Sequence, residues 1–165
     1  MENIKIVLLK PSEWEMYKAI RLEELREDPQ AFGSNYEKES NFSDEQWQER
    51  PSNKNSLIFV AKDRETPIGL VGALIKQEED EKIAHIWGMY VNSNYRGIRL
   101  GKRLMKKVLE AIQQAEVKKV QLMVDYEPTP AQLLYRSLGF QATETTDYIL
   151  SDGKEHKLYI MEKEL

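Results

Sequence analysis

Residues 95–109 read YRGIRLGKRLMKKVL and form the most informative segment of the chain. Apolar residues stand at every fourth position from Leu100 to Ile112, which is typical of one buried face of an α-helix. Upstream, residues 83–91 read IAHIWGMYV, an apolar and aromatic run of strand length. The segment therefore predicts a strand, a turn with glycines and an amphipathic helix, in that order.

The turn carries two glycines, Gly97 and Gly101, which let the backbone bend tightly and leave nearby amides unshielded. The first N–H groups of a helix have no partner inside it, and they lie at the positive end of the helix dipole, so they attract phosphate. Residues 93–109 hold six basic residues and no acidic one. Of the 24 basic and 28 acidic residues in the chain, this leaves 18 basic against 28 acidic elsewhere. Positive charge is thus concentrated where phosphate is expected.

The pattern excludes two common phosphate-binding motifs and fits a third. There is no Gly-Lys-Ser/Thr of a P-loop, and Arg99 replaces a glycine that a dinucleotide fingerprint requires. The segment resembles the signature of the GNAT superfamily of N-acetyltransferases, Arg/Gln-x-x-Gly-x-Gly/Ala. Arg96 and Gly101 fill its ends, and Gly97 gives the common Arg-Gly variant. Arg99 departs from the pattern at the middle glycine, so its side chain must point outward or bind the phosphates itself.

A second motif supports the resemblance. Residues 131–140 read AQLLYRSLGF and are similar to the family's Ala-x-x-Leu-Tyr-x-x-x-Gly-Phe segment, at the usual distance behind the first motif. A strand-like run, VQLMV, lies between them at residues 120–124. The resemblance covers residues 57–140 well, and the flanks follow by pattern only.

The resemblance implies a fold of the α/β class, α+β in type: a mixed, mostly antiparallel sheet of about seven strands with splayed central strands and about four helices. We expect a single N-acetyltransferase domain over residues 1–165. Capping signals predict helices after Ser12 with Glu15, after Ser43 with Gln46 and after Thr129, with the second ending before Pro51. Hydrophobic runs predict strands at residues 4–9, 57–61, 68–75, 82–91, 119–125, 143–150 and 156–161.

In this family the pantetheine arm of acetyl-CoA lies in the gap between the splayed strands. By resemblance, main-chain bonds to this arm come from Met89, Tyr90 and Val91. The pyrophosphate is held by Arg96, Gly97, Ile98, Arg99, Leu100, Gly101 and Lys102. Acetyl-CoA is therefore the expected co-substrate.

Acetyl transfer to an amine requires proton transfers, and acidic and basic side chains positioned at the reacting atoms assist them. Tyr135 occupies the family's usual general-acid position, although a tyrosine there can also simply pack. His85 stands where the family often has a glutamate base; a strand histidine can accept a proton near neutral pH, or it can be structural. Asp125 and Glu127 are weaker base candidates. Pro128 replaces an asparagine that often contacts the cofactor arm.

Composition sets the remaining limits. The 165 residues, 41% hydrophobic and 32% charged, are typical of a soluble globular protein. The chain has no cysteine and two histidines, so we expect no metal. No signal-like or membrane-spanning run occurs, so we expect a cytoplasmic protein without a membrane partner.

The acceptor is expected to be a primary amine on a small molecule, a peptide or a protein. The acidic balance favours a cationic amine, although acids such as those in residues 37–49 are more simply solvated. Two alternatives stay open. One is a non-catalytic acyl-CoA sensor, because of Pro128 and His85. The other is a nucleic-acid binder using residues 96–107, which a net charge of −4 disfavours. An edge strand in the C-terminal hairpin is compatible with a homodimer.

Overall fold

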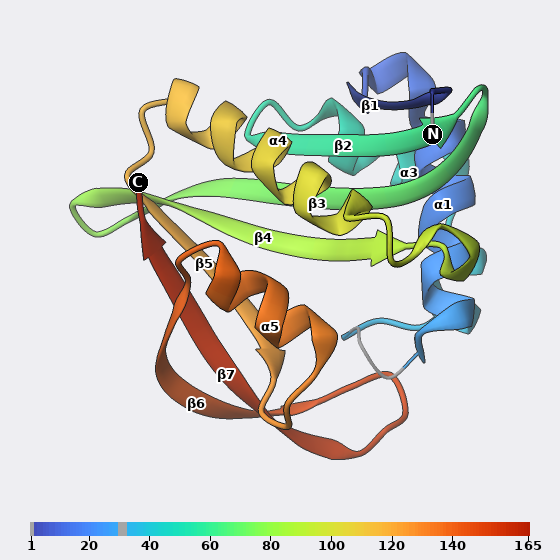
Figure 1. The fold of residues 1–165 in the computed structure, drawn as a ribbon. Helices are drawn as coiled ribbons and strands as arrows, with labels where there is room; N and C mark the ends of the chain where they lie inside the picture. The colour runs from blue at the N-terminus through green and yellow to red at the C-terminus, as the bar shows by residue number, and fades with distance from the viewer. Residues whose placement is uncertain (1, 30–32) are drawn as a thin grey trace.

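The computed structural model describes residues 2–29 and 33–165. Within these residues, seven strands form one sheet in the order β1-β2-β3-β4-β5-β7-β6 (Figure 1). Only β4 and β5 pair in parallel, and all other neighbours are antiparallel. The strands are β1 (Ile4–Leu8), β2 (Ser56–Asp63), β3 (Thr66–Glu78), β4 (Glu81–Val91), β5 (Lys119–Asp125), β6 (Gln141–Ile149) and β7 (Glu155–Glu164).

Helices cover the two faces of the sheet unequally. One face carries α4 and α5, and the other carries α1 and α3 over the half of the sheet that contains β1 to β4 (Figure 1). The other half of the sheet, formed by β5, β7 and β6, is therefore covered on one face only, by α5 among the described helices. The helices are α1 (Trp14–Glu27), α2 (Tyr36–Ser40), α3 (Asp44–Ser52), α4 (Leu100–Gln114) and α5 (Pro130–Ser137).

Two apolar cores follow from this layering, because alternate residues of a strand point to opposite faces. On β2, Phe59 and Ala61 pack in the core beneath α4, whereas Ile58 and Val60 pack in the core beneath α1 and α3. The central strands are thus buried on both faces. The α4 core also contains the residues of the predicted helix face, Leu100, Leu104, Val108 and Ile112.

The expected fold is confirmed, with differences at some helix ends. Ser43 and Gln46 form the predicted capping box. Pro51 lies inside the last turn of α3 rather than after it, since a proline there removes only one N–H from the turn. The predicted box at Ser12 is wrong: the chain makes a 3-10 turn over Pro11–Glu13, in which Glu13 Oε2 accepts the Lys10 N–H at 2.8 Å.

The short helix α2 was not predicted. Its first turn is capped by Asn35, whose Oδ1 accepts the Lys38 N–H at 2.7 Å. In residues 2–29 and 33–165, no helix has the length and apolar character that crossing a membrane requires. The same residues bring together no group of three or more His, Asp or Glu side chains placed to hold a metal ion.

Candidate active site

The turn before α4 has the geometry of an anion site. Gly97 has φ +81° and Arg99 has φ +62°, whereas Ile98 between them has a negative φ. This alternation turns successive N–H groups toward one point, as in anion-binding backbone nests. Among the described residues, no hydrogen-bond acceptor contacts the N–H groups of residues 97–102. Six consecutive amides therefore remain available to a ligand.

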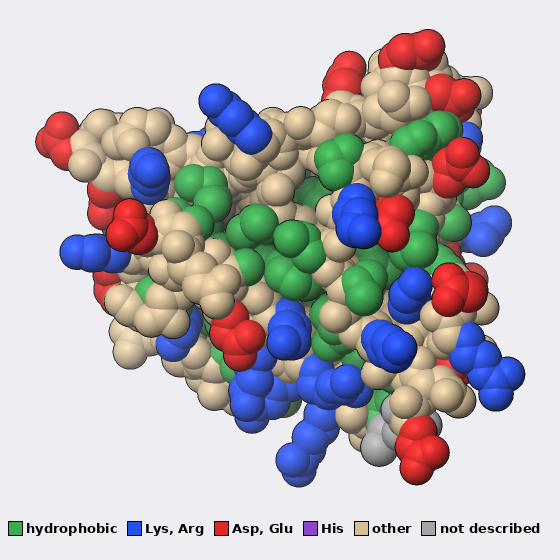
Figure 2. All heavy atoms as spheres, turned by 90° about the horizontal axis from the view of Figure 1, so that it is seen from above, with side chains coloured by type: hydrophobic (Ala, Val, Ile, Leu, Met, Phe, Trp, Pro, Cys, Tyr) green, Lys and Arg blue, Asp and Glu red, His purple; other side chains and the backbone are tan. Residues whose placement is uncertain are grey.

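The basic residues of this segment surround the amides without blocking them. The side chain of Arg99 is exposed, so the departure from the glycine pattern adds a cation at the surface and preserves the N–H. Arg96 turns back: its Nε donates to the Val91 carbonyl at 2.9 Å, and its Nη2 lies 3.5 Å from Asp28 Oδ2. Lys and Arg side chains gather on the side of the molecule where α4 lies (Figure 2). This face favours an anion.

Strands β4 and β5 separate at the same end of the sheet. Their parallel pairing joins Ile83, Ala84 and His85 to Lys119, Val120 and Gln121, and it stops there. Residues 86–91 of β4 and 122–125 of β5 have no partner in the other strand, and the two strands diverge visibly in Figure 1. Backbone groups along these two edges thus lack a partner in the facing strand, and only side chains bond the Val91 and Asp125 carbonyls, from Arg96 and Gln132.

A bulge distorts β4 beside this gap. Gly72 pairs with Trp87 and Leu70 pairs with Tyr90, so Gly88 and Met89 together lie opposite one residue of β3. Gly88 has φ +64°, a conformation that glycine adopts without strain. Bulges leave backbone groups unpaired and are frequent next to active sites. The bulge also places Met89 toward α4 and Tyr90 toward α1.

Gly101 lets the α4 turn approach this edge closely. A Cβ at this position would lie 3.0 Å from Met89 Cε and 3.4 Å from Leu134 Cδ2. The first turn of α4 therefore touches both the end of β4 and α5. The structure brings together all ten residues predicted to bind the cofactor, in two adjacent segments.

Tyr135 lies on α5 in the α4 core, where 6% of its surface is exposed. Its ring packs edge-on against Phe140, with centroids 6.1 Å apart. The hydroxyl has no hydrogen-bond partner among the described residues, and burial raises its pKa above the ordinary value. The Tyr135 hydroxyl thus carries a proton that it can donate, and burial makes it a weaker acid than a solvated tyrosine.

His85 faces the other side of the sheet. Its neighbours Ala84 and Ile86 point into the α4 core, so the imidazole points toward the face of α1. Its Nε2 lies 2.6 Å from Glu78 Oε1, and the side chain is about a quarter exposed, at 27%. Tyr135 and His85 thus belong to opposite faces of the sheet. Of the weaker base candidates, Glu127 is exposed, and Asp125 Oδ1 accepts the Glu127 N–H at 2.9 Å.

The model of the acetyltransferase (GNAT) family matches residues 18–140 of this chain. The chain belongs to the GNAT acetyltransferase family. Its fold is similar to that of a GNAT family acetyltransferase from Streptococcus pneumoniae, with a TM-score of 0.81 and 19% identity over 98% of this chain and 99% of the other. Arabidopsis thaliana NAA60, solved in complex with acetyl-CoA, gives a TM-score of 0.76 and 19% identity over 98% of each chain.

Sequence similarity reaches a larger protein as well. The chain is 30% identical over 103 residues to N-acetylaspartate synthetase from Xenopus tropicalis. The match covers 62% of this chain and 37% of the synthetase, so this chain matches little more than a third of that relative's length.

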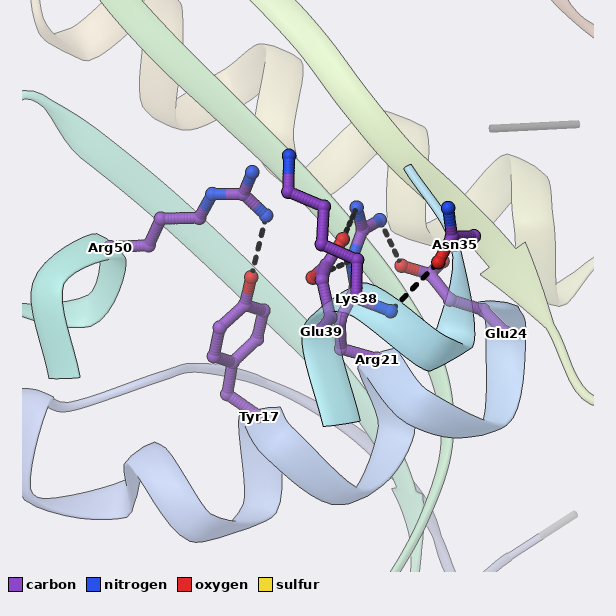
Figure 3. A network of polar contacts seen from close by, with 7 residues as sticks. All are labelled: Tyr17, Arg21, Glu24, Asn35, Lys38, Glu39 and Arg50. Atoms are coloured by element: carbon purple, nitrogen blue, oxygen red, sulfur yellow. Dashed lines mark hydrogen bonds and ion pairs between the residues drawn. The ribbon is translucent and has the colours of Figure 1, made fainter. Parts of the chain in front are cut away.

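On the α1 face, this GNAT domain holds a buried charged network that the sequence did not reveal (Figure 3). Arg21 donates from Nε and Nη2 to the two carboxylate oxygens of Glu39, at 3.0 and 2.9 Å. Its Nη1 donates to Glu24 Oε1 at 2.6 Å. The exposed fractions of the three residues are 5%, 1% and 0%. Glu39 was expected to be solvated with the other acids of residues 37–49, and that expectation is wrong because Arg21 binds it.

The network touches the bulge of β4. A Cβ on Gly88 would lie 3.5 Å from Glu24 Oε1 and 3.6 Å from Arg21 Nη1. Burial raises the pKa of Glu24 to about 8, although Arg21 opposes this shift. Burial also raises the pKa of Glu39, but its bonds to Arg21 outweigh burial and lower it overall. Charged side chains thus support the bulge from the face opposite α4.

Part of the expected acceptor-site wall lies outside the described residues. The resemblance to the GNAT family implies that the two N-terminal helices and the loop of residues 31–36 form one wall of the acceptor site, and the structure describes this loop from Gly33 onward. A Cβ on Gly33 would lie 3.0 Å from Cε1 of Tyr148 on β6. The loop therefore approaches the C-terminal hairpin at Gly33.

Proposed function

We propose that this GNAT domain transfers an acetyl group from acetyl-CoA to a primary amine by direct attack within a ternary complex. The observation that carries the proposal is the coincidence of two features at one end of the sheet. The β4–β5 gap opens there, and the unpartnered amides of residues 97–102 lie beside it. A long ligand with a phosphate at one end and an extended arm at the other fits both features.

The chain's backbone supplies most of the donor site in this proposal. The amides of residues 97–102 and the basic side chains around them bind the pyrophosphate of acetyl-CoA. The free edge of β4 at Met89, Tyr90 and Val91 bonds the pantetheine arm. Arg96 stiffens this edge by holding the Val91 carbonyl at 2.9 Å. Side-chain identity matters little for such contacts, so Arg99 and Pro128 are tolerated.

The reaction forms a C–N bond between the amine and the acetyl carbonyl carbon and breaks the C–S bond of the thioester. The amine loses a proton, and the departing sulfur gains one. Tyr135 acts as the acid, since its buried hydroxyl has kept its proton. His85 acts as the base, and the contact of its Nε2 with Glu78 Oε1 at 2.6 Å orients the imidazole.

Named relatives support an amine acceptor of this general kind. One related protein is an N-acetylaspartate synthetase, and a structural neighbour from Vibrio fischeri is a ribosomal-protein-S5-alanine acetyltransferase. Their names place the acceptor amine on an amino acid in one protein and on a ribosomal protein in the other. We propose that the acceptor of this chain also carries its amine on an amino acid or peptide.

Ligand-dependent thermal stability and thiol release test the proposal together. Acetyl-CoA and CoA should raise Tm, and Gly101→Leu should abolish this rise, because a side chain there meets Met89 and Leu134. Ala115→Leu, at the exposed far end of the same helix, is the matched control and should keep the rise.

Either of two results would reject the proposal. An unchanged Tm at millimolar acetyl-CoA would remove the donor site and leave the basic face of α4 to be tested with nucleic acid. A normal Tm rise without thiol release for any amine would instead support the non-catalytic sensor.

A further inference from the structure

An aromatic and cationic cluster lies on β4 immediately before the bulge. The indole of Trp87 lies over Gly72, where a Cβ would come 2.2 Å from ring atom Cε2. Tyr17 meets this indole edge-on, with centroids 6.2 Å apart. The guanidinium carbons of Arg50 and Arg21 lie 4.8 and 5.8 Å from the ring centroid. Trp87 is half-buried, and its indole contacts the guanidinium groups of two arginines.

The two arginines differ in what they bind. Arg21 is buried and engages the carboxylates of Glu24 and Glu39. Arg50, at the end of α3, is exposed and donates from Nη1 to the Tyr17 hydroxyl at 2.9 Å (Figure 3). No carboxylate pairs with Arg50 among residues 2–29 and 33–165. A guanidinium has five N–H donors in a fork that matches a carboxylate, so Arg50 has donors to spare.

The cluster lies where an acceptor must enter. The donor site is on the face of α4, and its arm would pass between β4 and β5 toward the bulge. The attacking amine therefore arrives from the opposite face, which Trp87 and His85 share. Trp87 directly precedes Gly88, so a ligand resting on the indole lies next to the bulge.

The carboxylates of this cluster pair with Arg21 and not with Arg50. Glu39 binds Arg21 through both carboxylate oxygens, and Glu24 Oε1 accepts from Arg21 Nη1. Arg50, in contrast, makes no ion pair with a carboxylate of the described residues. The overall acidic balance favoured a cationic acceptor, but the guanidinium of Arg50, which bonds only the Tyr17 hydroxyl among the described residues, favours an anionic group.

We propose that the acceptor amine carries a carboxylate, that Arg50 binds this carboxylate, and that Trp87 packs against the carbon chain between the two groups. The inference rests on the proposed acetyltransferase function and names its substrate class. Free amino acids and peptides with an acidic N-terminal residue share this chemistry. Arg50 would select among amines without touching the reacting atoms.

Paired substrates test the carboxylate directly. Thiol release from acetyl-CoA is measured with aspartate, glutamate and glycine, and with aspartic acid diamide, glycinamide and spermidine. Asp-Ala-amide and Asn-Ala-amide form the peptide pair and distinguish a peptide acceptor from a free amino acid. A charge-assisted hydrogen-bond pair should favour the carboxylate member in kcat/KM by about 10- to 100-fold.

Substitution of Arg50 should remove that preference. Arg50→Ala should lower kcat/KM for the carboxylate amines by about 10- to 100-fold and leave their uncharged partners within about 2-fold. Arg50→Lys should restore part of the loss, since it keeps the charge without the fork. Lys5→Ala, an exposed cation on the edge strand β1, is the matched control and should change neither group. Tm of each variant verifies folding.

The outcomes separate this inference from the proposed function. Faster turnover of spermidine or the amides than of the carboxylate amines overturns the inference while the acetyltransferase stands. Equal losses of kcat/KM for the carboxylate amines and for their uncharged partners in Arg50→Ala also overturn the inference while the acetyltransferase stands. If CoA binds but no carboxylate amine is acetylated, and aspartate, glutamate and Asp-Ala-amide cause no Arg50-dependent Tm rise in the CoA complex, the inference is also overturned. Loss of CoA binding itself rejects the acetyltransferase.

Discussion

Replacing Glu24 by glutamine should weaken the pH dependence of folding stability between about pH 5 and 8. The Glu24 side chain is fully buried; Oε1 accepts from Arg21 at 2.6 Å, and Oε2 has no hydrogen-bond partner among the described residues. Burial raises its pKa from 4.5 to about 8. Glutamine has nearly the same shape and can still accept from Arg21, but it does not titrate.

The sign follows from the protons bound in each state. Between the unfolded pKa of 4.5 and the folded pKa of about 8, the unfolded chain releases the Glu24 proton and the folded chain retains it. The contribution of Glu24 to stability is therefore full below pH 4.5 and declines as pH rises through this window. Each pH unit costs up to about 1.4 kcal/mol, so the whole window is worth on the order of 5 kcal/mol.

Equilibrium unfolding in urea at pH 5, 6, 7 and 8 measures the effect. The free energy of unfolding of Glu24→Gln, minus that of the unsubstituted protein, should rise steadily from pH 5 to pH 8. Glu15→Gln, at an exposed position on α1, controls for general effects of pH and should give a constant difference.

Replacing Glu39 by glutamine should change the pH dependence of folding stability in the opposite direction. Its pKa is lowered, so its contribution is present above the unfolded pKa of 4.5 and is lost as pH falls through the folded pKa. Glu39→Gln should therefore destabilise most at neutral pH and less toward pH 4.

A Glu24→Gln difference that does not change with pH would refute the reasoning, because it would mean that the Glu24 carboxyl is ionised in both the folded and the unfolded state.

Three further substitutions test other parts of the site. Tyr135→Phe should lower kcat by about 100-fold; Tm and the acetyl-CoA Tm rise should stay unchanged because the hydroxyl has no described partner, and an unchanged kcat would remove Tyr135 as the acid. Arg99→Gly should stabilise the fold by about 1 kcal/mol and raise Tm by about 2–4 °C, because a left-handed backbone strains arginine; a lower Tm would contradict this. Gly72→Ala should displace the Trp87 indole, shift its fluorescence and raise KM for the acceptor while acetyl-CoA still binds; an unshifted spectrum would contradict the close packing.

The strands and helices that were predictable are those with a strong period or cap. Residues 119–125 were predicted as a strand and form β5 with those bounds, because its apolar side chains alternate. Thr129 caps α5 as expected, with Oγ1 accepting the Gln132 N–H at 3.2 Å. The short α2 escaped prediction, because five residues are too few to show a helical period and its cap is a single asparagine.

The network of Arg21, Glu24 and Glu39 could not be predicted for a different reason. In α1 the charged residues share the buried face with Tyr17 and Ile20, so the helix lacks a clean apolar stripe. A buried ion pair looks like two solvated charges when the partners are 18 positions apart, as Arg21 and Glu39 are. Only the tertiary contact reveals that their burial is compensated.

The two halves of the site differ in how the sequence encodes them. The proposed donor half uses main-chain amides, which need glycines, a helix start and a strand edge, and these leave a recognisable motif. The proposed acceptor half uses side chains from α1, α3 and β4, which are separated in sequence and joined only by the fold. Arg50 and Trp87 are 37 positions apart, yet their side chains stack at 4.8 Å. A motif can therefore predict the acetyl donor, whereas a prediction of the acceptor needs tertiary contacts such as that between Arg50 and Trp87. Substrate pairs that differ in a single carboxylate test directly the acceptor that we propose from this contact.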